Sequence, residues 1–210
     1  MSTSSDLRTL VMHGLRLKGF AEARAVAETV GVGESDAEPM LEELVAEGLA
    51  TYRDGRISGY TLTPAGRADH ARRLAVELQS ADARQAVGDA YGRFLALNGR
   101  LLSICTAWQL RDGESVVNDH TDPAYDEAVI ADLRALHDAA LPICADLADA
   151  LERFAIYGPS LTHAIDRVEA GDTDWFTKPM LASYHTVWFE LHEDLLSTLG
   201  LERGSEEVTA

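Results

Sequence analysis

The sequence predicts a mostly α-helical protein in which one small β-hairpin interrupts the helices near the N-terminus. Through most of the 210 residues, apolar side chains recur at the spacing of helices that bury one face. Residues 49–53 and 57–63 instead have the pattern of two short strands around Asp54-Gly55, a dipeptide typical of tight hairpin turns. No strand pattern follows Thr63, so the rest of the chain is predicted to be an all-α helical bundle.

The composition is that of an ordinary globular protein, with 46% hydrophobic and 25% charged residues. The formal net charge of −17 is unevenly spread. Residues 1–80 hold nine basic and twelve acidic side chains, whereas residues 81–210 hold nine basic and twenty-three acidic ones. This acidity disfavours non-specific binding to nucleic acids or membrane surfaces, but it leaves room for a local basic patch.

The sequence carries no signal for a membrane or for a cofactor. It has no run of about 18 apolar residues, which predicts no transmembrane helix and no membrane partner. Residues 1–6 are polar and lack the parts of a signal peptide, which predicts a cytoplasmic protein. Cys105 and Cys144 lie in apolar helical patterns, and we interpret them as buried thiols in a reducing compartment. Metal-binding, Walker and dinucleotide-binding motifs do not occur in the sequence, so it predicts neither metal nor other cofactor.

Two short helices are predicted to open the chain. Leu7, Leu10, Val11 and Leu15 follow helical spacing, and Gly19 ends that helix. A second helix is predicted from Phe20 to Val30, before a Gly-Val-Gly turn.

A third helix is predicted to follow this turn. Ser35 and Glu38 have the spacing of a capping box, Pro39 is placed in the first turn, and Gly48 ends the helix. Beyond the hairpin, Pro64 takes the first position of the next helix, a place that suits its missing N–H.

Three helices followed by a hairpin form the layout of a winged helix-turn-helix, with the hairpin as its wing. Two sequence motifs carry the resemblance: Leu41-x-x-Leu44-x-x-x-Gly48-Leu49, and Tyr60-Thr61-Leu62-Thr63-Pro64-Ala65-Gly66-Arg67. Over about residues 5–75 the chain resembles the MarR and PadR type of bacterial winged-helix transcriptional regulators. The resemblance implies that the third helix enters the major groove of DNA and that the wing tip contacts the neighbouring backbone or minor groove. Winged helices also serve as protein-interaction modules, so the resemblance is less specific for DNA binding than for the fold.

The charges of this region favour a contact led by the wing. The third helix offers only Ser35 and acidic side chains at its predicted exposed positions, which are Glu34, Asp36, Glu38, Glu42 and Glu43. Carboxylates repel phosphates, and most affinity for DNA comes from Lys and Arg. Arg53 and Arg56 flank the wing turn and Arg67 follows it, so the predicted DNA-binding residues are Arg53, Arg56, Ser35 and Arg67. The alternative is that these arginines are solvated surface charges.

The remaining chain is predicted to be helical. Residues 1–80 are expected to form the winged-helix domain with a connector helix over 68–87, residues 81–201 a helical effector or dimerisation domain, and residues 202–210 a disordered acidic tail. The further helices are expected over residues 86–110, 123–140, 142–154, 160–170 and 183–199. Residues 111–122 are expected to be a polar loop, Gly158-Pro159 a break, and residues 175–179 an aromatic linker.

Three segments rich in polar and aromatic residues stand out in this region: Thr106–Gln109, Asn118–Asp126 and Ser183–Leu196. They resemble an actinobacterial helical module that is sometimes attached to phosphoenolpyruvate-utilising phosphotransfer proteins. The phosphohistidine motif and the phosphoenolpyruvate-binding barrel of that class do not occur in the sequence. The resemblance therefore implies an accessory or regulatory module and names no catalytic residue.

Helical spacing places His185, Trp188 and His192 on one face of the last helix. One interpretation is a pocket for a small-molecule effector. Its predicted ligand-binding residues are Trp108, His163, Trp175, Tyr184, His185, Trp188 and His192. The alternatives are an aromatic core with hydrogen-bonded histidines, or a metal site that combines His185, His192 and an acid. His120, with Asp119 and Asp122, lies in a loop where site residues are common, although Asn118 and Asp122-Pro123 also suit a turn and a helix cap.

These observations leave two hypotheses for function. The first is a homodimeric transcriptional regulator whose helical domain senses a ligand or forms the dimer. The second is a winged-helix accessory protein without DNA binding, whose acidic third helix docks on a protein partner such as a phosphoenolpyruvate-utilising enzyme. No nucleophile elbow or other catalytic pattern occurs, and an enzyme is not predicted.

Overall fold

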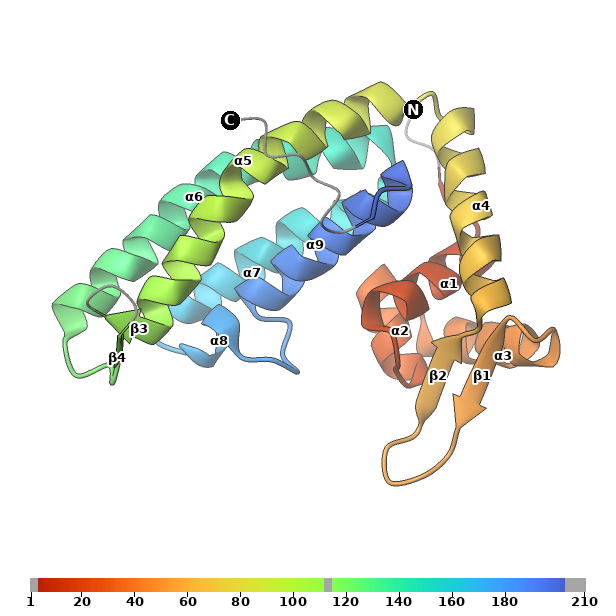
Figure 1. Cartoon of the computed structure of the whole chain (residues 1–210), viewed down its shortest axis with the longest axis horizontal. Coiled ribbons are helices and arrows are strands. Elements are labelled where there is room, and N and C mark those ends of the chain that lie inside the picture. The colour runs from red at the N-terminus through yellow and green to blue at the C-terminus, as the bar shows by residue number, and fades with distance from the viewer. Residues whose placement is uncertain (1–3, 112–114, 203–210) are drawn as a thin grey trace.

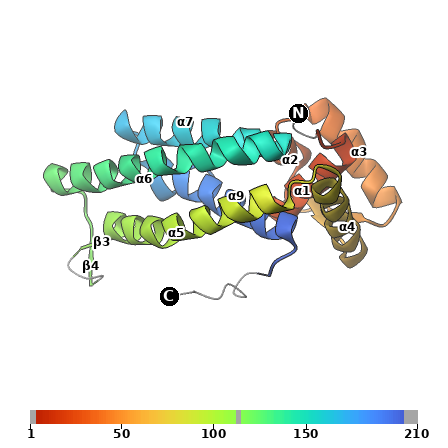
Figure 2. The same ribbon diagram turned by 90° about the horizontal axis from the view of Figure 1, so that it is seen from above.

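The structure, a computed structural model, describes residues 4–111 and 115–202. The described chain is mostly helical and carries a small antiparallel hairpin near its N-terminus, as the sequence predicts. The N-terminal helices and this hairpin lie at one end of a bundle of long helices (Figure 1). The same division is visible from above (Figure 2).

The N-terminal part consists of α1 (Leu7–Lys18), α2 (Ala23–Val30), α3 (Glu34–Ala46) and the hairpin of β1 (Ala50–Arg53) and β2 (Gly59–Leu62). The end of α1 at Gly19 confirms the prediction. The predicted start of α2 at residue 20 is wrong. Ala21 is instead bridged to Tyr60 of β2 by two backbone hydrogen bonds, of 3.1 and 2.8 Å, so this segment extends the hairpin.

The predicted capping box of α3 is also wrong. The N-cap residue is Gly33, so Ser35 lies inside the first turn, exposed, and cannot cap the helix. Pro39 lies within α3, beyond its first turn. The helix continues through Pro39 because a proline there removes only one backbone hydrogen bond, and the residue is exposed to water.

The motif Tyr60–Arg67, which spans β2 and the start of the next helix, has a clear structural basis. The side chain of Thr63 accepts a hydrogen bond from Gly66 N, caps α4 (Pro64–Ser80), and donates to the carbonyl oxygen of Gly48 at 2.8 Å. A Cβ atom on Gly66 would lie 1.9 Å from the carbonyl oxygen of Leu49, so only glycine fits there. Thr63 and Gly66 of this motif therefore fix the hairpin to the start of α4.

The predicted connector helix over 68–87 is two helices. α4 ends at Ser80, Asp82 has a positive φ of 50°, and α5 (Arg84–Gln109) then runs in a different direction (Figure 1). The prediction of no strand after Thr63 is wrong in one place, because β3 (Leu110–Arg111) pairs with β4 (Val116–Val117).

Two predicted helix breaks do not occur. α6 (Pro123–Ala150) continues through Pro142, and α7 (Tyr157–Glu169) begins before Gly158-Pro159, which lies in its first turn. A 3-10 turn, η1 (Glu152–Ile156), joins these two helices. The predicted aromatic linker overlaps the short helix α8 (Asp174–Thr177). α9 (Tyr184–Leu199) begins one residue after its predicted start, because Ser183 is its N-cap.

The buried apolar side chains form two separate clusters. One joins α1, α2, α3 and the β1–β2 hairpin, and the other lies among α5, α6, α7 and α9. Cys105 and Cys144 are free and buried in the second cluster, as interpreted from the sequence. None of the helices in the described part of the chain is long and apolar enough to span a membrane. Residues 203–210 of the predicted tail lie outside the described residues.

Candidate functional site

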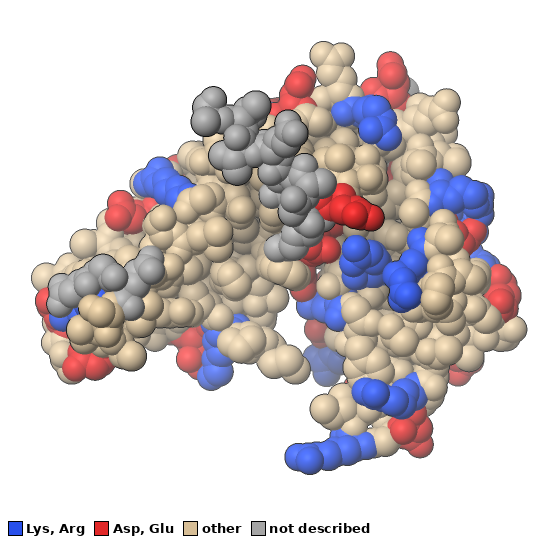
Figure 3. Space-filling model, viewed as in Figure 1, with Lys and Arg blue, Asp and Glu red and all other residues tan. Residues whose placement is uncertain are grey.

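The β1–β2 hairpin presents the predicted DNA-binding arginines to solvent. Arg53 is exposed and its guanidinium lies 4.6 Å from the centre of the Phe20 ring, while Arg56 is exposed near the tip. Figure 3 shows basic side chains on the protruding hairpin, with acidic surface beside them. The acid of the turn is Asp54, which accepts a hydrogen bond of 3.0 Å from Ser58. Arg67 is exposed at the start of α4 and donates to the carbonyl oxygen of Leu62 at 2.8 Å.

The other basic side chains of residues 1–80 are neutralised by carboxylates of the same chain. Their pairs are Arg8–Glu47, Arg16–Glu193, Lys18–Glu190, Arg24–Glu28, Arg72–Asp69 and Arg73–Asp69. Arg53, Arg56 and Arg67 have no carboxylate partner within the described residues. The uncompensated positive charge of this part therefore lies on and beside the hairpin.

The solvent face of α3 is predominantly acidic. Its acidic side chains are exposed and form no ion pair in the described part of the chain: Glu34, Asp36, Glu38, Glu42 and Glu43. Ser35 is exposed among them. This face would meet phosphates with negative charge, which opposes binding.

Three of the predicted ligand-binding residues belong to the core of the bundle. Tyr184 is fully buried, and Trp188 is stacked on Phe94 with ring centres 4.6 Å apart. Trp188 Nε1 donates to Asn98 Oδ1 at 3.0 Å, and His192 is buried against Phe94. Burial strongly raises the pKa of Tyr184. These contacts are those expected of an aromatic core, the alternative that the sequence left open.

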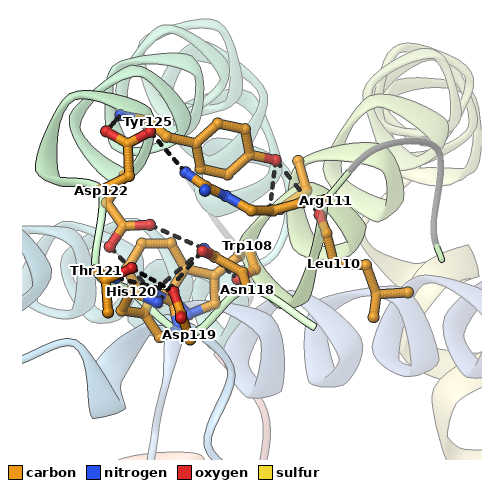
Figure 4. A network of polar contacts seen from close by, with 11 residues as sticks. Trp108, Leu110, Arg111, Asn118, Asp119, His120, Thr121, Asp122 and Tyr125 are labelled. Carbon is orange, nitrogen blue, oxygen red and sulfur yellow. Dashed lines mark hydrogen bonds and ion pairs between the residues drawn. The ribbon is translucent and has the colours of Figure 1, made fainter. Parts of the chain in front are cut away.

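Trp108 lies in a second cluster, at the end of the bundle that carries β3 and β4 (Figure 4). Its ring stacks on Phe176 at 4.5 Å and contacts the His120 ring at 4.4 Å. His120 Nδ1 lies 3.0 Å from Asp126 Oδ2, and buried Asn118 donates to both Asp126 and the Trp108 carbonyl oxygen. The loop is thus an ordered polar network.

The same network explains the flanking residues. Asp122 caps α6 and pairs with Arg111 at 2.9 Å, and Arg111 lies over the Tyr125 ring. Tyr125 donates to the carbonyl oxygens of Ala107 and Leu110 at the end of α5. The interpretation of Asn118 and Asp122 as turn and helix-cap residues accounts for both. Asn118 stabilises the turn by its hydrogen bonds, and Asp122 caps α6.

The remaining predicted ligand-binding residues lie apart from these clusters. His163 is exposed on α7, and its ring is nearly perpendicular to that of half-buried Trp175, with ring centres 4.9 Å apart. His185 is half-buried at the start of α9, and burial lowers its pKa. The seven residues therefore form no single pocket. Among the described residues, no group of three or more His, Cys, Asp or Glu side chains is arranged to hold a metal ion.

A buried ionic network joins the two parts of the molecule. Arg153 of η1 donates to Glu77 of α4 at 2.9 Å and pairs with Asp194 of α9. His13 Nε2 of α1 lies 3.0 Å from Asp194 Oδ2, and His13 Nδ1 shares a hydrogen bond of 3.0 Å with His70 Nε2. Three further hydroxyls complete the network: Tyr157 and Thr198 with Asp194, and Ser5 with Glu77.

Burial and charge act against each other in this network. Burial favours the neutral carboxylic acid, yet Arg153 and His13 lower the pKa of Asp194 well below its ordinary value. Likewise, burial favours neutral Arg153, but Asp194 and Glu77 raise its pKa. Burial lowers the pKa of His70 to about 3. The ion pair therefore stays charged while His70 stays neutral at ordinary pH.

Sequence reasoning did not single out this network, although a signal was present. His70, Leu74 and Glu77 are spaced three and four residues apart, as are Leu191, Asp194 and Thr198. Charged residues at positions that helical spacing assigns to a buried face predict buried partners. Comparisons with protein-family models, with curated proteins and with solved structures give no match to this chain.

Proposed function

We propose that the protein is a winged-helix transcriptional regulator that contacts DNA chiefly through its hairpin. In this proposal α1–α3 form the helix-turn-helix, the β1–β2 hairpin is the wing, and the helical bundle senses a ligand or forms a homodimer. The observation that carries it is the placement of charge. Six of the nine basic side chains of residues 1–80 pair with carboxylates, and the three that do not are Arg53, Arg56 and Arg67.

The acidic face of α3 defines how this contact works. Five exposed carboxylates next to phosphates would cost affinity, so α3 does not read bases in the usual way. The arginines of the hairpin supply the attraction by displacing counterions from phosphates. We therefore expect binding that is weak and that depends strongly on salt.

The test is binding of the full chain to DNA from the region upstream of its own gene, followed by fluorescence anisotropy at several salt concentrations. The variant carries Arg53→Ala with Arg56→Ala, and its control carries Arg24→Ala with Arg72→Ala, which removes two paired arginines. Loss of two phosphate contacts should weaken binding at least tenfold and reduce the salt slope by about 2, whereas the control should bind as the wild type. The proposal fails if the wild type shows no preference for this DNA over unrelated DNA at about 100 mM salt, or if the hairpin variant binds as well as the control.

A second candidate is an interaction module without DNA binding, favoured by the five unpaired carboxylates on the exposed face of α3. Its partner would offer a basic surface, and a phosphoenolpyruvate-utilising enzyme is the partner that the sequence suggests. Reversing Glu42 and Glu43 to Lys should then abolish capture of such an enzyme from its native host, with DNA binding absent. Capture that is unaffected by the reversal excludes this use of α3.

A further inference from the structure

A groove of about 680 Å³ lies between α6, η1 and the start of α7. Figure 2 shows α7 on the far side of α6 from α5, so these elements form an outer face of the bundle. The lining residues are Leu141, Cys144, Ala145, Ala148, Ala155, Gly158, Pro159, Thr162, His163 and Asp166. This volume falls within the range of small-molecule sites, about 300–1,000 Å³.

The lining specifies the chemistry of an occupant. Its walls are apolar, it contains no Lys or Arg, and its acidic group is Asp166. One oxygen of Asp166 accepts from Arg134 at 3.3 Å, and the side chain is 62% exposed, so its second oxygen is open to a ligand. The Thr162 hydroxyl donates its proton to the carbonyl oxygen of Gly158 at 2.9 Å, so this proton is not available to bind an anion. An apolar molecule with a positive charge matches this lining, whereas an anion does not.

Acidic side chains beyond the lining act in the same direction. Asp138 and Asp149 lie on the exposed surface of α6, about one helical turn before Leu141 and after Ala145, and neither forms an ion pair within the described residues. His163 lies at the same surface, with its ring nearly perpendicular to that of Trp175. The groove therefore combines an apolar floor with acidic side chains at and beside its rim, an arrangement that suits an apolar cation.

The groove shares one short segment with the buried network. Ala155, Gly158 and Pro159 face the groove, while Arg153 and Tyr157 of the same segment contact Asp194. Arg153 also holds Glu77 of α4. A molecule that shifts this segment would therefore change the contacts that set the position of α1 and α4, and with them the hairpin.

We propose that this groove binds a small apolar cation, and that the bound cation alters the position of the N-terminal helices through η1. The second half of the proposal rests on the proposed function, because its readout in the cell would be altered DNA binding. The first half concerns the groove alone.

The experiment uses tetraphenylphosphonium and tetraphenylborate, two ions of nearly equal shape and opposite charge, in calorimetric titrations of the full chain. Tetraphenylphosphonium should bind at least tenfold more tightly than tetraphenylborate. Ala145→Trp should fill the groove and abolish binding, while Ala139→Trp, on an exposed position of α6 outside the lining, should leave it unchanged. Equal binding of the two ions, or undiminished binding to Ala145→Trp, overturns the proposal.

A second variant covers the case in which Ala145→Trp does not fold. Asp166→Lys reverses a mostly exposed charge and should weaken tetraphenylphosphonium binding by tenfold or more while favouring tetraphenylborate. If Asp166→Lys binds both ions as the wild type does, the groove is not the site.

Coupling to the N-terminal part is measured separately. In the anisotropy assay, saturating tetraphenylphosphonium should change DNA affinity by about fivefold, and Ala145→Trp should abolish the change. Charge-selective binding without any DNA binding would refute the proposed function and leave the groove site standing. DNA binding that is indifferent to the bound cation would refute the coupling alone.

Discussion

His13 of α1 and Asp194 of α9 meet in the interior, where His13 Nε2 lies 3.0 Å from Asp194 Oδ2. Both side chains are 2% exposed. Arg153 pairs with the same carboxylate and extends the contact to Glu77 of α4. Since α1 and α4 carry the hairpin and α9 belongs to the bundle, this network fixes how the hairpin is presented relative to the bundle.

The Arg153→Met variant should be strongly destabilised. It removes the buried cation and leaves Glu77 and Asp194 without their shared partner, which typically costs about 3–5 kcal/mol. Arg167→Met is the matched control, because Arg167 pairs with Asp172 at the surface and such pairs contribute about 0–1 kcal/mol. Urea denaturation measures both free energies of unfolding. Similar losses in the two variants would show that the buried network adds little.

The buried His70 predicts that the protein loses stability as the pH falls. Burial, together with nearby His13 and Arg153, lowers its folded-state pKa to about 3, whereas in the unfolded chain it is about 6.5. Between these values the unfolded chain binds a proton that the folded protein does not. The contribution of neutral His70 to the free energy of unfolding is therefore fully present above about pH 6.5. Below that pH it decreases, by up to about 1.4 kcal/mol per pH unit.

His70→Gln tests this origin, because its amide can still reach His13 but does not titrate. Urea denaturation between about pH 6.5 and pH 5 avoids most of the carboxylate titration. The variant should have a flatter dependence of unfolding free energy on pH than the wild type. Parallel curves would assign the pH dependence to other groups.

Local signals predicted the elements that local chemistry decides. Gly19 ends α1 in the positive-φ conformation, a signal that lies within a few residues of sequence. Pro142 misled the prediction because proline usually ends a helix. In α6, Pro142 and Asp138, the residue whose carbonyl loses its partner, are both exposed to solvent, and the helix continues through the proline.

The buried network could not be assembled from the sequence in the same way. Its members come from the segment before α1 and from α1, α4, η1, α7 and α9, and no local spacing says which of these polar residues meet. The aromatic residues misled for a related reason. Trp108, Tyr184 and Trp188 were grouped into one pocket by residue type, whereas packing distributes them between two ring clusters.

His120 predicts an unusual order of stability for two small substitutions. Its φ of 57° lies in the left-handed region, which costs a non-glycine residue about 1–2 kcal/mol. His120→Gly and His120→Ala both remove the imidazole from Trp108 and Asp126, so their difference reports the backbone alone. After allowance for the greater flexibility of glycine in the unfolded chain, His120→Gly should be the more stable by about 0.5–1 kcal/mol. Thermal unfolding measures this difference, and an alanine variant of equal or greater stability would contradict it.

Glycine-to-alanine substitutions at Gly66 and Gly88 should have opposite effects. A Cβ at Gly66 would lie 1.9 Å from the carbonyl oxygen of Leu49, an oxygen that also accepts the backbone N–H of Thr63 at 3.0 Å. Since backbone cannot yield as a side chain does, Gly66→Ala should cost about 3 kcal/mol or more and loosen the hairpin from α4.

Gly88 lies within α5, where an added Cβ would meet nothing within 4 Å. Gly88→Ala should therefore stabilise the protein by about 0.5–1 kcal/mol, because alanine loses less backbone freedom when the helix forms. Urea denaturation of both variants provides the comparison, and hydrogen exchange of β1 and β2 shows whether the Gly66→Ala loss is local to the hairpin. If Gly66→Ala left both the unfolding free energy and the exchange of the hairpin unchanged, the packing of Leu49 against the first turn of α4 would not be what fixes the hairpin.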